Sequence, residues 1–101
     1  MSHYIILWNF TDQGLKSIND SPKRAEAFKN VIEKAGGKLI GTYYTFGKYD
    51  GISIVEASDD AIVMSSLLSV ESQGNARTLT LKAFTYDEAA KLIVLRSPNL
   101  S

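Results

Sequence analysis

The sequence contains no cysteine and a single histidine, His3. Without thiols there can be no disulfide, thiolate nucleophile or cysteine-ligated zinc or iron–sulfur site. One imidazole also excludes a two-histidine metal motif within one chain. We therefore predict no metal and no cofactor, and the lack of cysteine fits the cytoplasmic location that we expect.

Long apolar runs and an excess of one charge are also missing. No run of about 18 apolar residues exists, so no membrane span is expected, and the N-terminus lacks the basic and apolar regions of a signal peptide. Lys plus Arg number 11, as do Asp plus Glu. Because the charges balance, no net field attracts nucleic acid or an anionic membrane, and we predict neither as a partner.

Length and composition predict one globular domain over residues 1–101. The chain is 45% hydrophobic and 22% charged, which is ordinary globular usage, and it is too short for a second core. A domain of this size buries only roughly two-thirds of its unfolded surface. Burial between copies of the chain would therefore add stability.

The centre of the chain is predicted to form a β-hairpin. Two runs rich in β-branched and aromatic residues, 42–46 and 52–57, flank Gly47-Lys48-Tyr49-Asp50-Gly51. Glycine at each end of this loop accepts a positive φ without steric cost. The pattern therefore favours two antiparallel strands joined by a short loop.

Periodicity predicts further strands and helices on both sides of the hairpin. Alternation indicates strands over residues 3–11, 38–46 and 76–84. Helical spacing indicates helices over 22–35, from 61 to a stop at 73–75, and over 86–96. Each helix has polar cap residues at its start: Ser21, Ser58-Asp59-Asp60, and Thr85 with Glu88.

The order β-α-β-β-α-β plus a terminal helix is the ferredoxin-like arrangement, an α+β fold with a four-stranded antiparallel sheet. Both internal helices pack on one face of the sheet, which leaves the other face without cover. The first strand nevertheless carries apolar side chains on both sides. Because such a patch is rarely left in water, we predict a homodimer, or a higher oligomer built from it, in which two sheets form a dimeric α/β barrel.

The motif Gly47-Lys48-Tyr49-Asp50, followed by Val55-Glu56-Ala57 and Asp59-Asp60, resembles the signature of GYD-domain proteins, small bacterial members of the dimeric α/β-barrel group. Residues 9–14, 21–24, 74–78 and 83–85 support the resemblance, which runs from about Tyr4 to Arg96. Ser58 stands where proline is common, and Ala76 where a larger aliphatic residue is usual. The resemblance implies the fold and the dimer, but it implies no activity.

Six residues are candidates for ligand binding: Asn9, Tyr43, Tyr44, Tyr49, Asp50 and Arg77. Asp50 is either a general base at the barrel mouth or an acceptor of backbone amides within its turn. The Tyr49 hydroxyl either binds a ligand or the ring packs against a helix end. For both residues the structural interpretation is preferred, because aspartate at a hairpin tip has a local reason to exist.

The other candidates also have two interpretations each. Asn9 with a nearby tyrosine would orient a carbonyl or phenolic oxygen inside the barrel, or else it bonds to backbone in an aromatic core. Alternation prevents Trp8, Asn9, Tyr43, Tyr44 and Phe46 from sharing one surface. Arg77 either pairs with Glu56 or Asp50, or it holds a carboxylate or phenolate ligand bidentately. Lys82 is expected in an ion pair, and His3 is expected to be solvated.

Two classes of function stay open. The preferred one is a ligand-binding or assembly module in which the sheet face is an interface, with a second copy and a small-molecule ligand as partners. The alternative is a cofactor-independent monooxygenase or isomerase acting on a small aromatic or lactone, which is an analogy at the level of fold. A pocket of roughly 300 Å³ or more with converging polar groups would favour the enzyme. Whether the chain is an enzyme is left open.

Overall fold

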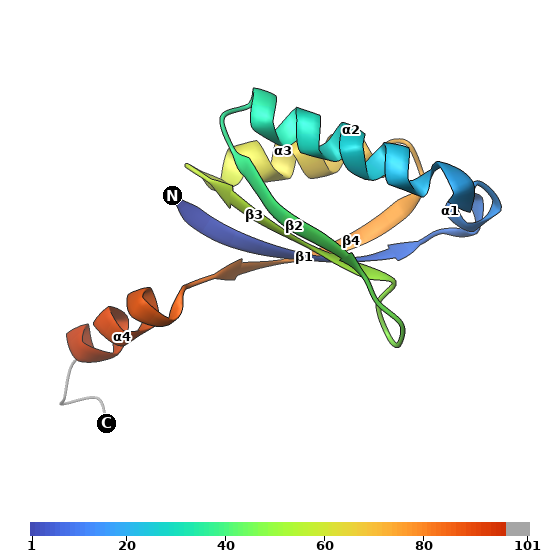
Figure 1. Ribbon diagram of the computed structural model, residues 1–101. Helices are drawn as coiled ribbons and strands as arrows, with labels where there is room; N and C mark the ends of the chain where they lie inside the picture. Colours follow the sequence, from blue (N-terminus) through green and yellow to red (C-terminus); the bar gives the residue numbers. More distant parts are fainter. Residues whose placement is uncertain (97–101) are drawn as a thin grey trace.

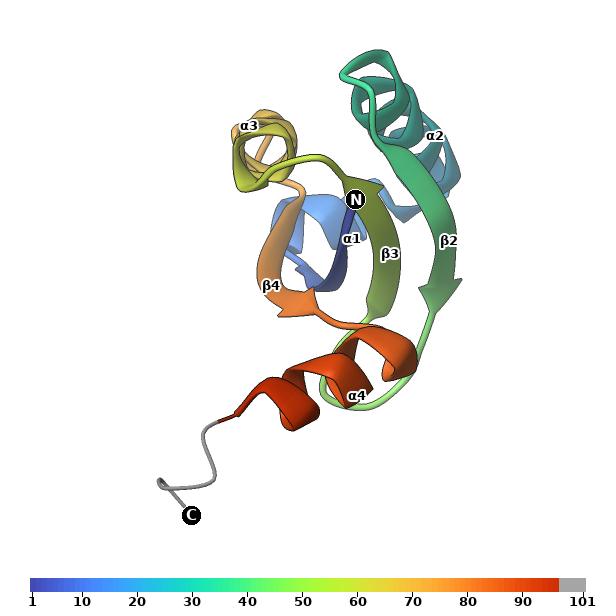
Figure 2. The same ribbon diagram turned by 90° about the vertical axis from the view of Figure 1, so that its left-hand side faces the viewer.

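A four-stranded antiparallel sheet with strand order β2-β3-β1-β4 forms the centre of the computed structural model, which describes residues 1–96 (Figure 1). Its strands are β1 (Ser2–Phe10), β2 (Lys38–Tyr44), β3 (Gly51–Ala57) and β4 (Ala76–Ala83). The helices are α1 (Asp12–Lys16), the 3₁₀ turn η1 (Ile18–Asp20), α2 (Ser21–Lys34), α3 (Asp60–Glu71) and α4 (Tyr86–Leu95). Helices α2 and α3 lie on one face of the sheet (Figure 2). The expected ferredoxin-like α+β fold is confirmed.

Local polar groups start and end the helices. The Asp59 carboxylate accepts the backbone N–H of Ile62 at 3.0 Å and caps α3. Thr85 and Glu88 form the predicted capping box at the start of α4. Gly36, with φ of 94°, follows the end of α2 and provides the left-handed residue that the Gly-Gly pair predicts.

Helix α2 starts differently from the prediction. Ser21 is the first helical residue and not the cap, and Asp20 at the cap position makes no side-chain cap bond. The Ser21 hydroxyl instead lies 2.7 Å from the Tyr44 hydroxyl on β2. A tertiary hydrogen bond therefore takes the place of the expected local one.

The hairpin between β2 and β3 is present, but its first strand is shorter than predicted. Strand β2 ends at Tyr44, two residues before Phe46, and the Thr45 N–H donates to the Asp50 carbonyl across the loop at 2.9 Å. Only Gly47 of the two loop glycines has a positive φ, at 124°. Gly51 belongs to β3 and is required for a different reason, the close approach of a tryptophan ring described below.

The hydrophobic core lies between the sheet and helices α2 and α3. Tyr4 and Ile6 of β1 and Val55 of β3 point toward the helices and are buried. Ala57 at the end of β3, Ile32 of α2 and Val63 of α3 complete the buried cluster. The core is therefore supplied by alternate residues of the central strands and by one stripe of each helix.

The opposite side of the sheet, here called the open face, is apolar at its centre. In register, Leu7 lies between Ile52 and Leu79, and Ile5 lies between Ile54 and Leu81. These six residues define the open face: Ile5, Leu7, Ile52, Ile54, Leu79 and Leu81. Leu79 and Leu81 are 48% and 47% exposed. Within residues 1–96 no helix packs over this face (Figures 1 and 2).

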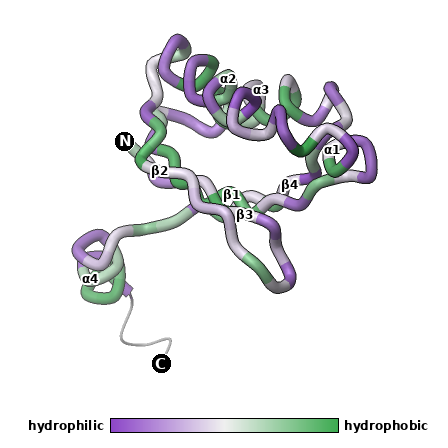
Figure 3. Tube along the Cα trace, turned by 45° about the vertical axis from the view of Figure 1, so that its right-hand side comes forward, coloured by the Kyte–Doolittle hydropathy of each residue, from purple (hydrophilic) through white to green (hydrophobic). Residues whose placement is uncertain are grey.

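Helix α4 projects past the end of β4 and away from α2 and α3 (Figure 1). It carries a hydrophobic stretch (Figure 3), and Val94 and Leu95 are 82% and 78% exposed. An isolated helix of ten residues is only marginally stable in water. Pro98, expected to follow this helix, lies outside the described residues. Within residues 1–96 no helix is long and apolar enough to cross a bilayer.

Candidate functional site

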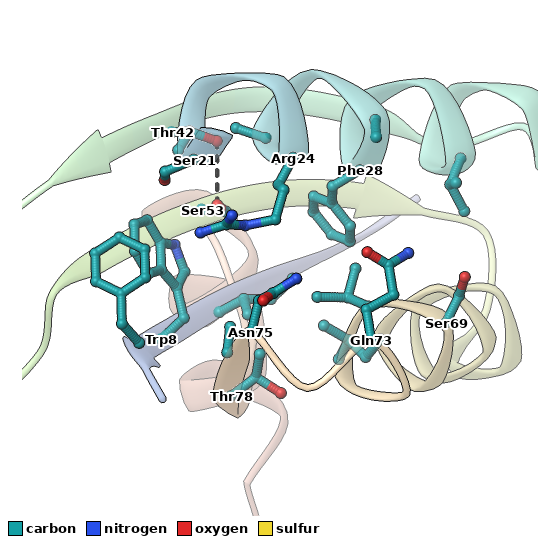
Figure 4. A pocket seen from close by; sticks show the side chains of 18 of the residues that line it. Trp8, Ser21, Arg24, Phe28, Thr42, Ser53, Ser69, Gln73, Asn75 and Thr78 are labelled. Atoms are coloured by element: carbon teal, nitrogen blue, oxygen red, sulfur yellow. Dashed lines mark hydrogen bonds between the residues drawn. The ribbon is translucent and has the colours of Figure 1, made fainter. Parts of the chain in front are cut away.

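A cleft of about 110 Å³ lies between the sheet and helices α2 and α3 (Figure 4). Arg24 and Phe28 of α2 form one wall, Trp8 of β1 lies at one end, and Gln73 and Asn75 follow α3 on the other side. Most of the remaining lining is aliphatic or aromatic. The cleft thus combines apolar surfaces with hydroxyl, amide and guanidinium side chains that can orient a ligand, as ligand pockets do.

Three aromatic rings form one end of the cleft. Trp8 meets both Phe10 and Tyr44 edge to face, with ring centroids 5.3 Å apart in each pair and interplanar angles of 71° and 89°. Such pairs contribute about 0.5–1.5 kcal/mol each beyond the area that they bury. The Tyr44 hydroxyl is held by Ser21, so this end of the cleft is fixed by packing and by one hydrogen bond.

Among residues 1–96, Arg24 supplies the only charge that lines the cleft. Its Nη1 donates to the Ser17 carbonyl at 3.0 Å and lies 3.2 Å from the Ser17 hydroxyl, and its Nη2 donates to the Gly14 carbonyl at 3.3 Å. All of these acceptors are neutral. No salt bridge within residues 1–96 involves Arg24, and no aspartate or glutamate lines the cleft.

The candidates Asn9 and Asp50 join the hairpin to the end of β1. The Asp50 carboxylate accepts the Phe10 N–H at 2.9 Å, and the Asn9 side-chain oxygen accepts the Asp50 N–H at 3.0 Å. Both side chains therefore bind backbone amides, and Asp50 binds one outside its own turn. Their role toward a ligand stays a prediction, as does that of Tyr49, whose carbonyl accepts the Thr45 hydroxyl at 2.7 Å.

The six candidates do not form one site. By strand register Tyr43 and Arg77 lie on the side of the sheet that carries the open face, whereas Tyr44 lines the cleft on the other side. The expected ion pair of Arg77 with Glu56 or Asp50 is not formed. Arg77 is opposite Asn9 at one end of the sheet, and Glu56 is at the other end.

His3 differs from its prediction as a solvated residue. Its side chain is 26% exposed, and its Nε2 lies 2.9 Å from the Glu56 carboxylate. Its Nδ1 is buried and lies 3.9 Å from the Glu88 carboxylate, beyond hydrogen-bond distance. The imidazole is thus packed at the polar end of the open face, beside the junction of β4 and α4.

Asp60, at the start of α3, binds Tyr4 and Lys82. Its carboxylate accepts the Tyr4 hydroxyl and lies 3.1 Å from Lys82 Nζ, which gives Lys82 the ion pair that the sequence favours. The hydrogen bond from Tyr4, followed by the one from Lys82, lowers the pKa of Asp60. The same carboxylate, followed by burial, raises the pKa of Tyr4, and it also raises the pKa of Lys82. The cluster fastens α3 to β1 and β4.

Arg24 is the charged residue of the cleft, and the sequence analysis did not select it as a candidate. It lies in a surface-like run of charges with Lys23 and Glu26, which suggests a solvated helix face. Its spacing of four from Phe28, a residue of the inward stripe, is the signal that places it over the cleft.

Among residues 1–96, no group of three or more acidic or imidazole side chains could hold a metal ion.

Comparisons with known proteins agree with this fold. The sequence profile of the GYD domain family matches residues 4–93. A Thermus thermophilus protein named glutamine synthetase and cystathionine beta-lyase binding protein is 32% identical over 84 residues, which are 82% of this chain and 88% of that protein.

Two solved structures show the same fold. A crystal structure from Thermus thermophilus aligns with a TM-score of 0.50 at 26% identity, over 84% of this chain and 95% of the other. A feast or famine regulatory protein from Mycobacterium tuberculosis aligns with a TM-score of 0.64 at 14% identity. That alignment covers 84% of this chain and 51% of the other, and it supports the fold alone.

Proposed function

We propose that this chain, which belongs to the GYD domain family, is a homodimeric binding module that pairs through its open face and holds an enzyme as a partner. The observation that carries the proposal is the apolar centre of a sheet face that no described helix covers. Leaving six aliphatic side chains of one contiguous patch in water is unfavourable. A second copy offers a matching surface, because the interface of a two-fold dimer uses the same patch on both subunits.

The polar residues around the open face fit an interface. Arg77 and Asn9 lie beyond its apolar rows at one end, and His3 with Glu56 lies beyond them at the other. An apolar centre with a polar rim is the usual anatomy of a protein–protein interface. Two such faces packed together would close the α/β barrel that the sequence analysis predicts.

Helix α4 would add to the same interface. It continues from β4, an edge strand of the sheet, and its exposed Val94 and Leu95 are not needed for the core of their own chain. In a face-to-face pair the helix would extend past the edge of one sheet toward the other subunit. Burial there would stabilise a short helix that is marginal alone.

The protein partner is proposed from a relative. The Thermus protein is named for binding glutamine synthetase and cystathionine β-lyase, and we propose that this chain also binds a metabolic enzyme, in a bacterial cytoplasm. The cleft of about 110 Å³ is well below the roughly 300 Å³ expected of a substrate pocket. This volume favours the binding module over the oxygenase or isomerase.

Size-exclusion chromatography with light scattering tests the dimer. The wild-type chain should elute at twice its monomer mass of 11.1 kDa. Leu81→Lys, on the edge strand β4 at one side of the open face, should give a folded monomer, because Leu81 is half exposed in the single chain and a charge there opposes pairing. Leu15→Lys is the matched control on α1, where leucine is 51% exposed and lies outside the face. A wild-type monomer at all concentrations would refute the dimer.

A separate binding measurement tests the partner. Immobilised wild-type protein should retain purified glutamine synthetase or cystathionine β-lyase from the same organism at micromolar concentration. Retention of neither enzyme would remove the partner part of the proposal. The dimer would be unaffected by that result, since it is measured on the chain alone.

A further inference from the structure

We propose that the cleft between the sheet and helices α2 and α3 binds a small organic monocarboxylate, with Arg24 as the group that holds the carboxylate. The cleft lies on the opposite side of the sheet from the open face, so this site goes beyond the binding module proposed above and does not depend on pairing. Three properties of the cleft carry the inference: its charge, its neutral donors and its size.

The charge of the cleft selects an anion. In the part of the chain that the structure describes, Arg24 is the only charged residue of the lining, and all of its acceptors are neutral. A guanidinium has five N–H donors, and the contacts with Ser17 and Gly14 account for three. Nε–H and one Nη2–H make no bond within the described chain, and one edge of a guanidinium suits the two oxygens of a carboxylate. Arg24 extends from α2 into the cleft, on the same side as Trp8 (Figure 4).

Neutral polar groups in the lining of the cleft offer further hydrogen bonds. The Asn75 side-chain oxygen accepts from Gln13 at 2.9 Å, which leaves the Asn75 amide nitrogen free to donate toward a ligand. The hydroxyls of Thr42 and Ser53 lie 3.1 Å apart on the floor of the cleft. Donors of this kind would orient an anion without cancelling its charge, whereas an acidic residue would repel it.

The size and lining of the cleft limit the rest of the ligand. The volume is about 110 Å³, and a cavity of about 150 Å³ holds benzene, so the apolar part has at most about six carbon atoms. Phe28 and Trp8 provide the surfaces against which it would pack. An amino group on the ligand would lose water without gaining an acidic partner. The site therefore favours a short carboxylic acid over the corresponding amino acid.

The only tryptophan of the chain, Trp8, lines the cleft and supplies the measurement. Its fluorescence is followed while butanoate, butanamide, butylamine or 2-aminobutanoate is added at constant low ionic strength in a buffer without carboxylates. Butanoate should give a saturable change and bind about tenfold or more tightly than the amide, since hydrogen bonds to charged groups are the stronger ones. Butylamine and 2-aminobutanoate should bind more weakly than butanoate. Equal binding of acid and amide, or no binding of the acid, would overturn the proposal without any variant.

Two variants locate the carboxylate. Arg24→Gln should reduce the affinity for butanoate about tenfold and leave that for butanamide unchanged. Lys23→Gln, which removes an exposed neighbouring charge, is the matched control and should bind as the wild type does. Circular dichroism checks that both variants fold. Unchanged butanoate affinity in folded Arg24→Gln would refute the role of Arg24.

Light scattering on the same samples separates this proposal from the dimer. Butanoate binding by a monomeric wild-type chain would support the cleft site and count against the proposed pairing. A dimer that does not bind butanoate would support the proposed pairing and refute the cleft site.

Discussion

The indole ring of Trp8 lies against Gly51, so closely that a Cβ atom at position 51 would be 2.0 Å from Cζ2 of the ring. The two residues are partners in the register of β1 and β3. Because Gly51 has no side chain, the ring can cross the neighbouring strand and meet Phe10 and Tyr44 edge to face. The second glycine of the hairpin motif therefore serves the aromatic end of the cleft and not the turn.

Gly51→Ala should lower the free energy of unfolding by about 1–3 kcal/mol, the usual cost of overpacking. Gly41→Ala is the control, since its Cβ would lie 3.3 Å from Cε2 of the Tyr43 ring on the exposed side of the sheet, and should cost less. Urea unfolding followed by circular dichroism measures both. In the double variant Trp8→Leu with Gly51→Ala, the penalty of the alanine should shrink. Strict additivity of the two changes would show that the ring and the glycine do not interact.

Tyr44→Phe should cost about 1 kcal/mol of stability, because it removes the hydroxyl that pairs with Ser21 at 2.7 Å and leaves a buried serine without this partner. Tyr43→Phe, one residue earlier on the other side of the strand, should change stability little. Thermal and urea unfolding of the two variants give a direct comparison. Equal melting temperatures would mean that the Ser21–Tyr44 bond contributes nothing.

Asp50→Ala should lower stability by about 1.5–3 kcal/mol, the range for hydrogen bonds to charged groups, since the Phe10 N–H loses its carboxylate acceptor. Glu26→Ala, on the exposed side of α2, provides the control. Ligand binding in the cleft should stay intact in both variants. Loss of binding by Asp50→Ala at an unchanged melting temperature would instead identify Asp50 as a binding residue.

Protonation of Asp60 should lower the stability of the protein in acid. Its pKa is lowered in the folded state by the hydrogen bonds from Tyr4 and Lys82, so the unfolded chain binds the proton more tightly. The resulting stabilisation is present above the ordinary value of 3.8 and is lost as the pH falls through the folded pKa. Urea unfolding between pH 7 and pH 2 should show a shallower decline for Asp60→Asn than for the wild type. Parallel curves would contradict a role for this carboxylate.

Ionisation of Tyr4 should lower the stability of the protein at alkaline pH. Its pKa is raised above 10.0 in the folded state, so its contribution is complete below that value and is lost as the pH rises through the folded pKa. Spectrophotometric titration of tyrosinate absorbance, compared between the wild type and Tyr4→Phe, measures the shift. Titration of Tyr4 at its ordinary value would contradict it.

The parts of the fold that sequence could predict depend on local signals. Alternation in β1 and β4 indicated strands whose successive side chains point to opposite sides of the sheet, and Thr85 with Glu88 identified the start of α4. These signals involve residues close together in the chain, so spacing alone carries them. The family resemblance is confirmed by the match over residues 4–93.

The candidate site was harder to predict, because it depends on residues far apart in the chain. Serine is a preferred helix-cap residue, yet the hydroxyl of Ser21 forms its hydrogen bond with the hydroxyl of Tyr44 on β2. A register irregularity between Leu39 and Gly41 lies within β2, so the strand's simple alternation does not fix which tyrosine reaches the cleft. Arg24 lines the cleft, whereas its acidic neighbour Glu26 is exposed on another side of the same helix. Such contacts have no counterpart in residue spacing.

The alternation of β1 also determines how the protein can be altered. Ile6 and Trp8 serve the core and the cleft, whereas Ile5 and Leu7 belong to the open face. Substitutions at even and odd positions of this strand can therefore modify one surface while sparing the other. Inserting or deleting a single residue in β1 would exchange the two sets and damage both surfaces together. Engineering of this strand should tolerate replacements far better than changes in length.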